Sequence, residues 1–281
     1  MKTALITGAS SGIGAACALA LAEKGFQVCL TARRKERLED LCRQVNQRHG
    51  ADRAICYAGD VTDAAVRRGT IEMVLSRWGR VDVLVNNAGT AMPGAVEEVN
   101  LDLVRQQFEL NVLAYLGWMQ LAGPVMRAQG GGRIINMSSI SGRLSFPCMG
   151  VYSAGKFAVE ALSDAARIEY KPWNLHVVLV EPGSVVTEIW EQSLNLARSA
   201  LPSPESSPFR RLYEAEQEYA RELAGGKGPT ADLVAKAVCR AATARRPRTR
   251  YCVPWDVCAM SLLAHLPTRI RDWLVQRAMG L

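Results

Sequence analysis

Short apolar runs alternate along the chain with longer segments in which apolar positions recur at helical spacing. The run VDVLVNNAG has no polar alternation in its apolar part, which is typical of a parallel strand buried on both faces. Strands that alternate with helices predict an α/β fold built on a parallel sheet. The predicted strands are Lys2–Thr7, Phe26–Thr31, Arg53–Ala58, Val81–Gly89, a run that begins at Arg133, and Leu175–Glu181.

The intervening segments predict helices, and the pattern changes twice toward the end of the chain. Residues 188–228 include the proline- and serine-rich stretch LPSPESSPF, a composition expected of a mobile surface segment. After Pro254 apolar residues recur largely at helical spacing, interrupted at Pro267, which can start a second helix. We therefore predict one domain over residues 1–254 and a helical extension over 255–281. The predicted helices of the domain include about Val96–Glu109, Val112–Ala128, one beginning near Tyr152, and about Thr230–Thr243.

Length and composition agree with a single intracellular domain. At 281 residues and 49% apolar composition, the chain can bury a substantial core. It contains no apolar run long enough to cross a bilayer, and the first strand begins directly after Met1. Eight cysteines form no CxxC pair, which favours buried free thiols over disulfides or metal ligands. We expect a cytoplasmic protein without a metal site.

A glycine-rich turn, TGASSGIG, joins the first strand to the following helix. Its backbone N–H groups can approach a pyrophosphate closely, and the helix N-terminus favours the anion. The next strand completes a βαβ unit, which is the setting of a dinucleotide site in a Rossmann-like domain. A tight turn that needs glycine only for its backbone is the alternative. The predicted cofactor contacts of the turn are Gly8, Ser10, Ser11, Gly12, Ile13 and Gly14.

The end of the second strand predicts which dinucleotide binds. NAD-selective folds place an acidic residue there for the ribose 2′-hydroxyl, whereas an arginine accommodates a 2′-phosphate. Ala32 stands at the acidic position and Arg33 follows it, so NADP(H) is favoured over NAD(H). Alternatively, Arg33 belongs to the solvated start of a helix. Farther along, Asp60 can accept a hydrogen bond from the adenine amino group and Val61 can pack on its ring, unless Asp60 caps the next helix.

A strand that ends at Ser139 precedes a helix that carries Tyr152 and Lys156. Residues four apart share a helix face, so the phenol and the ammonium are held together. The positive charge is expected to lower the tyrosine pKa from its ordinary value of about 10, which makes Tyr152 a candidate general acid and base. With the serine hydroxyl in the same space, the trio suits proton transfer to a carbonyl or from an alcohol.

The motifs TGxxxGxG, NNAG, YxxxK and PG-x-V-x-T occur in this order, with Ser139 thirteen residues before Tyr152. The combination resembles the short-chain dehydrogenase/reductase family, over residues 1–190 by motif and 230–255 by pattern. The resemblance implies a doubly wound sheet of seven parallel strands in the order 3-2-1-4-5-6-7 with helices on both faces. It implies that Asn86 ties neighbouring strands together. The implied catalytic residues are Asn111, Ser139, Tyr152 and Lys156. The implied further cofactor contacts are Asn87, Ala88, Gly89, Tyr152, Lys156, Pro182, Gly183, Val185 and Thr187.

The resemblance also implies a reaction. NADPH would give its 4-pro-S hydride to a ketone or aldehyde carbon, while Ser139 binds the substrate oxygen and Tyr152 donates its proton. Lys156 would lower the phenol pKa and bind the nicotinamide ribose, and Asn111 would distort its helix and hold a water. Residues 188–228 correspond to the substrate lid of the family, and a homodimer or homotetramer is implied.

PRTRY and the extended C-terminus resemble the branch that contains hydroxysteroid and retinol dehydrogenases. This favours a small lipophilic substrate that is steroid- or retinoid-like. Two alternatives stay open. One is a reductase of 3-oxoacyl chains or other small carbonyl compounds, and the other is a sensor that binds NADP(H) without turnover.

Basic charge is concentrated at the end of the chain. Residues 240–281 carry eight arginines against two aspartates, which accounts for most of the formal net charge of +7. The rest is nearly neutral and has no aromatic-interleaved basic motif, so no nucleic-acid partner is expected. Two interpretations of the extension remain: its helices pack over the substrate pocket or a dimer partner, or they form a basic amphipathic element at an anionic membrane surface.

Overall fold

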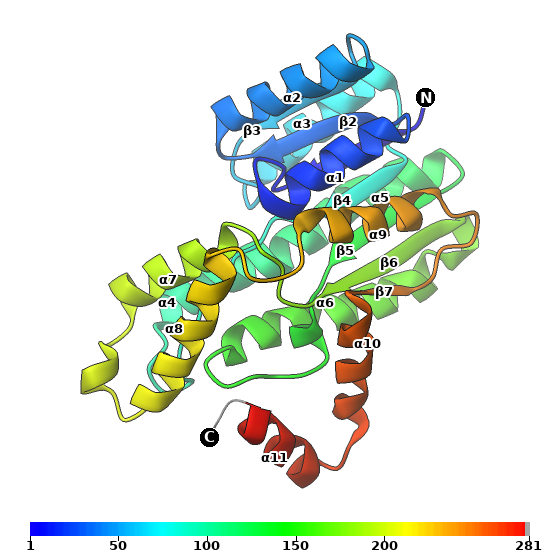
Figure 1. Ribbon diagram of the computed structural model, residues 1–281. Coiled ribbons are helices and arrows are strands. Elements are labelled where there is room, and N and C mark those ends of the chain that lie inside the picture. The colour runs from blue at the N-terminus through cyan, green and yellow to red at the C-terminus, as the bar shows by residue number, and fades with distance from the viewer. Residues whose placement is uncertain (279–281) are drawn as a thin grey trace.

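The computed structural model describes residues 1–278, and its centre is a seven-stranded sheet in which all neighbouring strands are parallel. The strand order is β3-β2-β1-β4-β5-β6-β7, which confirms the predicted doubly wound topology (Figure 1). The order reverses between β1 and β4, and ligands of such sheets bind beyond the carboxyl ends of the strands at that point. The strands are β1 (Thr3–Thr7), β2 (Gln27–Ala32), β3 (Ala54–Ala58), β4 (Val83–Asn86), β5 (Gly132–Met137), β6 (Leu175–Pro182) and β7 (Arg250–Val253).

Helices cover both faces of the sheet, and this explains why the strands are apolar without alternation. In β1, Ala4 and Ile6 point into one buried cluster while Leu5 points into a second on the opposite face. The first cluster also contains residues of three helices, α1 (Gly12–Glu23), α2 (Lys35–His49) and α9 (Ala231–Thr243). The second contains residues of α3 (Ala64–Trp78), α5 (Ala114–Ala128) and α6 (Gly150–Glu169).

The helices predicted around Val96–Glu109 and Val112–Ala128 form one continuous helical segment. It begins later than predicted, as α4 (Leu101–Phe108), because the side chain of Asn100 accepts hydrogen bonds from the first free N–H groups, Asp102 N at 2.8 Å and Leu103 N at 3.3 Å. Where the sequence indicated a break, a π-helical turn over Glu109–Leu113 leads into α5. The distortion at Asn111 is therefore a widened turn within a helix.

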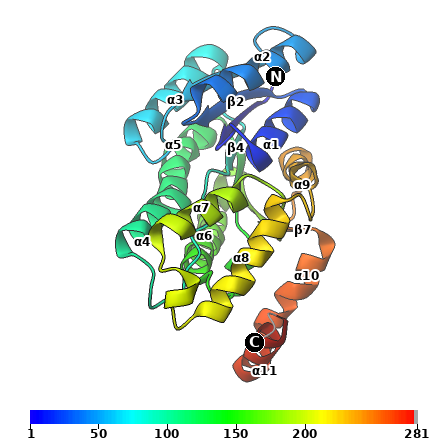
Figure 2. The same cartoon turned by 60° about the vertical axis from the view of Figure 1, so that its left-hand side comes forward.

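Two helical pairs stand beside the sheet (Figures 1 and 2). The first is α7 (Ile189–Ala200) and α8 (Arg210–Ala224), which pack against each other and are joined by the proline- and serine-rich stretch. The second follows β7 and consists of α10 (Trp255–Ser261) and α11 (Thr268–Ala278), and α11 begins directly after Pro267, as predicted. Residues 279–281 of the predicted extension lie outside the described residues. No helix among residues 1–278 is long and apolar enough to span a membrane.

Candidate active site

A cavity of about 1440 Å³ lies at the carboxyl ends of the strands. A single small-molecule site typically measures roughly 300–1,000 Å³, so this cavity has room for a dinucleotide together with a substrate. The predicted cofactor and catalytic residues lie on its wall, except Gly14 and Asn111, which lie behind it. The wall residues among them are Gly8, Ser10, Ser11, Gly12, Ile13, Arg33, Asp60, Val61, Asn87, Ala88, Gly89, Ser139, Tyr152, Lys156, Pro182, Gly183, Val185 and Thr187.

The turn after β1 is shaped as a close-approach loop that fits a pyrophosphate. Gly8 has φ +66°, a conformation that L side chains rarely adopt. A Cβ on Gly14 would lie 2.3 Å from the carbonyl oxygen of Gly8, so only glycine lets the helix start against the turn. The side-chain amide of Asn87 donates to the carbonyl of Thr7 at 2.9 Å and thereby fixes the end of β4 beside the turn. The turn therefore offers its backbone to a ligand at the N-terminus of α1.

Arg33 and Asp60 both line the cavity, on the segments that follow β2 and β3. Arg33 is exposed, and its positive charge acts on the Asp60 carboxyl. Burial raises the pKa of Asp60, but hydrogen bonds from the Thr62 N–H and hydroxyl, with the Arg33 charge, outweigh it and leave the pKa lowered. The helix cap is Asp63, which accepts from Ala65 N at 2.7 Å, so Asp60 is free of the capping role considered for it.

Arg34 is a residue of this region that sequence reasoning missed. Its guanidinium donates to the hydroxyls of Ser10 at 3.1 Å and Ser11 at 2.5 Å, and it pairs with Glu188 at 2.6 Å. The only signal in the sequence is the arginine pair after Ala32, of which Arg33 alone was predicted to contact the cofactor. Arg34 thus links the glycine-rich turn to the beginning of α7, which is a contact between segments more than 150 residues apart.

The structure brings Ser139, Tyr152 and Lys156 together at the other end of the cavity. Ser139 follows β5 and accepts a hydrogen bond from Ser141 N at 3.1 Å, which fixes its side chain. Tyr152 and Lys156 lie one turn apart in α6, and the Lys156 ammonium is 5.7 Å from the centre of the Tyr152 ring. The ammonium donates to the Met137 carbonyl at 2.8 Å and lies 5.4 Å from the ring centre of Tyr115.

The pKa of Tyr152 is raised, whereas the sequence predicted that it would be lowered. Burial raises it, and the lowering influence is the hydrogen bond with Ser139 rather than the charge of Lys156. The lysine itself is almost fully buried, and burial lowers its pKa to about 8 against the raising influence of Glu160. In this structure, therefore, Ser139 is the residue that favours ionisation of the phenol.

Asn111 is buried within the π-helical turn and does not face solvent. Its amide donates to the Thr90 carbonyl at 2.8 Å and accepts from Thr90 N at 3.0 Å. These two bonds hold the strand end that carries NNAG against the helix. Asn86 bonds the Asn136 side chain of the neighbouring strand at 2.8 Å, which confirms the predicted tie between β4 and β5.

The segment after β6 lines the cavity beside the glycine-rich turn. Thr187 lies against the glycine-rich turn, because a Cβ on Gly12 would be 3.2 Å from its methyl group. The indole N–H of Trp190 donates to the Val185 carbonyl at 2.8 Å, so this carbonyl already has a partner within the chain. The bond fixes the loop onto α7, and nothing in the sequence signals it.

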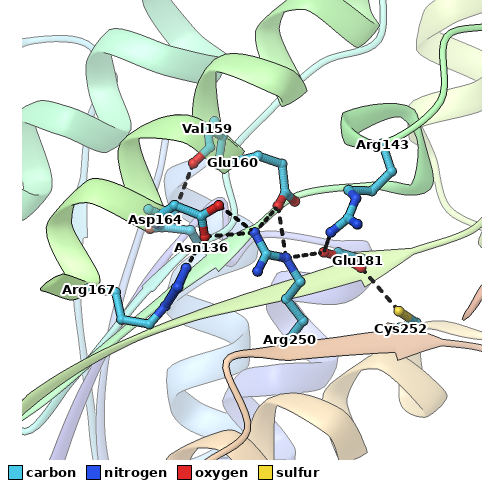
Figure 3. Close-up of polar contacts among 10 residues, drawn as sticks. Asn136, Arg143, Val159, Glu160, Asp164, Arg167, Glu181, Arg250 and Cys252 are labelled. Carbon is cyan, nitrogen blue, oxygen red and sulfur yellow. Dashed lines mark hydrogen bonds and ion pairs between the residues drawn. The ribbon is translucent and has the colours of Figure 1, made fainter. Parts of the chain in front are cut away.

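A partly buried ionic cluster supports α6, the helix that carries Tyr152 and Lys156 (Figure 3). Arg250 of β7 pairs with Glu160 at 3.1 Å and Asp164 at 2.7 Å, both on α6, and with Glu181 of β6 at 3.0 Å. Burial raises the pKa of Glu160, opposed by a hydrogen bond with Ser138 and by Arg250. Because Glu160 lies one turn beyond Lys156, Arg250 connects the sheet edge to the active-site helix.

Comparisons with known proteins agree with this geometry. The sequence model of the family described as short chain dehydrogenase matches residues 2–196. The chain is 38% identical over 238 residues to the uncharacterized oxidoreductase YusZ of Bacillus subtilis, covering 83% of each chain. It is 32% identical over 280 residues to the NADPH-dependent 3-dehydrocapnine reductase of Ornithobacterium rhinotracheale, covering 97% of this chain and 95% of the relative.

A solved structure has the same fold. The short-chain dehydrogenase/reductase from Burkholderia phymatum in complex with NAD matches with a TM-score of 0.81 and 27% identity, covering 94% of this chain and 92% of that one. One relative is thus named for NADPH and one solved structure holds NAD, so the comparisons support a nicotinamide cofactor without a choice between the two. The chain belongs to the short-chain dehydrogenase/reductase family of oxidoreductases.

Proposed function

We propose that this protein is an NADP(H)-dependent oxidoreductase that interconverts a lipophilic ketone or aldehyde and the corresponding alcohol. The observation that carries the proposal is the single cavity whose wall includes both the glycine-rich turn and the trio Ser139, Tyr152 and Lys156. Arg33 at the nucleotide end supports NADP(H), and the Ornithobacterium relative is named for NADPH.

A nicotinamide cofactor bound beside the glycine-rich turn would provide the hydride chemistry at the carbonyl carbon. The Ser139 hydroxyl donates a hydrogen bond to the substrate oxygen, and Tyr152 transfers its proton to that oxygen as the carbonyl becomes an alcohol. Lys156 contributes positive charge beside the phenol, and Asn111 holds the NNAG segment in position through Thr90. In the opposite direction the Tyr152 oxygen takes the proton back.

The substrate end of the cavity favours a lipophilic compound. Apolar side chains from the segment after β4, from α4 and the π-helical turn, from the loop before α6, and from α7, α8 and α10 line it, which suits a substrate with a large apolar part. We propose residues 1–254 as the catalytic domain and 188–228 as its lid. The apolar wall residues of this end include Met92, Leu103, Leu110, Phe146, Ile189, Trp190, Leu196, Leu223 and Met260.

A panel of ketones tests the reaction. Purified protein is mixed with NADPH and with steroid, retinoid, aliphatic and acyl ketones, and the loss of NADPH absorbance is followed. Turnover of one of the first three classes is expected. Turnover of acyl ketones alone would favour the 3-oxoacyl reductase, while tight NADPH binding without any turnover would favour the sensor.

Arg33 is the residue expected to make the protein prefer NADPH to NADH. Arg33→Ala removes a charge-assisted contact to a 2′-phosphate, worth about 1.5–3 kcal/mol, so NADPH affinity should fall by roughly ten- to a hundredfold. NADH affinity should hardly change, since NADH has no such phosphate. Lys35→Ala is the matched control, because Lys35 is exposed on the next turn and pairs with Glu39. Titrations of cofactor fluorescence measure both affinities, and equal losses for the two cofactors would assign Arg33 a structural role.

We propose that the C-terminal extension, residues 255–281, both packs over the substrate pocket and contacts a membrane surface. Val257 of α10 is buried and Met260 lines the cavity, so α10 packs over the substrate end. Four apolar side chains of the extension point to solvent, with exposed fractions of 50% or more, and arginines lie among them. We propose that this outer face contacts an anionic membrane surface, where lipophilic substrates dissolve. These exposed residues are Trp255, Leu262, Ile270 and Trp273.

Vesicle binding tests the membrane contact. The protein should pellet with anionic vesicles at low salt, because basic residues near such a surface contribute about 1 kcal/mol each. Binding should weaken as salt shortens the Debye length to about 10 Å at 0.1 M. The pair of changes Ile270→Ser and Trp273→Ser should abolish pelleting, whereas Val96→Ser, at an even more exposed apolar site outside the extension, should not. Absence of pelleting by the unchanged protein would leave the extension as a packing element.

We also propose a cytoplasmic homodimer or homotetramer. All eight cysteines are unpaired, which supports a reducing compartment. Leu113, Phe157 and Ile168 of the α5 and α6 segments are exposed apolar side chains, as expected at an interface between copies.

A further inference from the structure

The helix α8 turns one face toward the body of the protein, and this face contains a carboxylic acid. Tyr213, Ala220 and Leu223 are the buried apolar members of the face, and Glu216 stands among them with only 7% of its surface exposed. A carboxyl group at such a position costs free energy unless it has a partner. Among the described residues, Oε1 of Glu216 is buried and has no hydrogen-bond partner.

Glu216 lines the same cavity as Ser139, Tyr152 and Lys156. Burial raises its pKa to about 7, and the opposing influence is the charge of Arg221 on the outer side of the helix. Nearly all buried polar groups in native proteins have a partner. Glu216 borders the cavity and the described chain supplies no partner for Oε1, so its carboxyl group is available to a molecule that fills the cavity.

The charged side chains around Glu216 indicate whether a molecule bound there is positively or negatively charged. Acidic side chains of α8 and α10 line the substrate end, and the cation of this end, Lys227, is already paired with Glu222 at 2.8 Å. The remaining cations on the wall lie at the nucleotide end or in the catalytic trio. A cavity with an excess of negative charge concentrates cations and disfavours anions. The acidic residues of this end on the two helices are Glu216, Glu218, Glu222 and Asp256.

We infer that the substrate is a lipophilic carbonyl compound or alcohol that also bears a protonated amine, and that Glu216 binds this amine. The inference rests on the proposed function, in which Ser139 and Tyr152 receive the carbonyl oxygen, and it adds a second polar anchor at α8. An ammonium group supplies the charge-assisted hydrogen bond that the Glu216 carboxylate lacks within the chain. Substrates attached to an anionic carrier fit this end poorly.

Binding of octylamine and of octan-1-ol to the NADPH complex tests the inference by calorimetry. The two probes share one apolar chain and differ in charge, because an alkylamine is protonated at neutral pH. The amine should bind about ten- to a hundredfold more tightly than the alcohol. Glu216→Gln keeps the shape of the side chain and should remove this preference. Glu214→Gln, on the outer side of the same helix and paired with Arg210, should keep it.

Equal affinities for the two probes in the unchanged protein, or a preference that survives in Glu216→Gln, would overturn the inference. Thermal unfolding of the same samples shows whether each variant is folded, and Glu216→Met provides a second uncharged replacement. Because these measurements need no turnover, they separate this inference from the proposed reaction. A protein that prefers the amine but reduces no ketone would refute the reaction and leave the amine site in place.

Discussion

Replacing Tyr152 by phenylalanine is expected to lower turnover by about 10²- to 10⁴-fold, the usual contribution of general acid and base catalysis. The change removes only the hydroxyl group at the cavity wall. The ring that Lys156 approaches at 5.7 Å remains, so NADPH affinity should change little. Single-turnover absorbance on the best ketone of the panel measures the chemical step, and cofactor fluorescence measures binding.

Tyr115→Phe is the matched control for this change. Tyr115 also lies beside Lys156, but its hydroxyl bonds the Met137 carbonyl at 3.4 Å within the protein interior. Loss of such a bond costs about 0.5–1.5 kcal/mol of stability and removes no proton donor from the cavity. Near-normal turnover in Tyr152→Phe, or an equal loss in both variants, would show that the proton comes from another group.

Local motifs made most of the fold and the cofactor half of the site predictable. The turn around Gly8 needs glycine because of its own backbone and its contact with Gly14, and both requirements lie within one short stretch. The strand order follows from the alternation of strands and helices together with the family resemblance. The role of Asn86 as a tie between strands was implied by the family resemblance, and its bond to Asn136 gives this buried polar side chain the partner that it needs.

Contacts between distant segments could not be predicted. Arg34 looks like a solvated helix start until Glu188 is placed beside it by the fold. The expected lowering of the Tyr152 pKa considered only the lysine beside the phenol, and the sequence could not reveal that burial of the phenol itself would raise its pKa. Glu216 likewise looks like one of many glutamates on a polar helix, and only the packing of α8 distinguishes it.

Arg250→Ala is expected to destabilise the protein by about 3–5 kcal/mol at neutral pH, because removing one partner of a buried ion pair leaves the charge of Glu160 uncompensated. Glu160 and Glu181 are 6% and 1% exposed, and the Arg250 guanidinium lies between them (Figure 3). Urea unfolding measures the loss as a shift of the midpoint at unchanged slope. Arg248→Ala is the control, since the side chain of Arg248 is exposed and such a substitution usually changes stability by less than about 0.5 kcal/mol.

The destabilisation caused by Arg250→Ala should also depend on pH. Arg250 lowers the pKa of Glu160, so its contribution is present where the carboxyl is ionised and is lost as the pH falls and the carboxyl takes up a proton. The difference between the variant and the unchanged protein should therefore shrink from neutral to acidic pH. A loss as small as that of Arg248→Ala would mean that the cluster adds no net stability. A loss that is constant with pH would mean that Arg250 acts through packing of its apolar stem, because packing does not depend on the charge of Glu160.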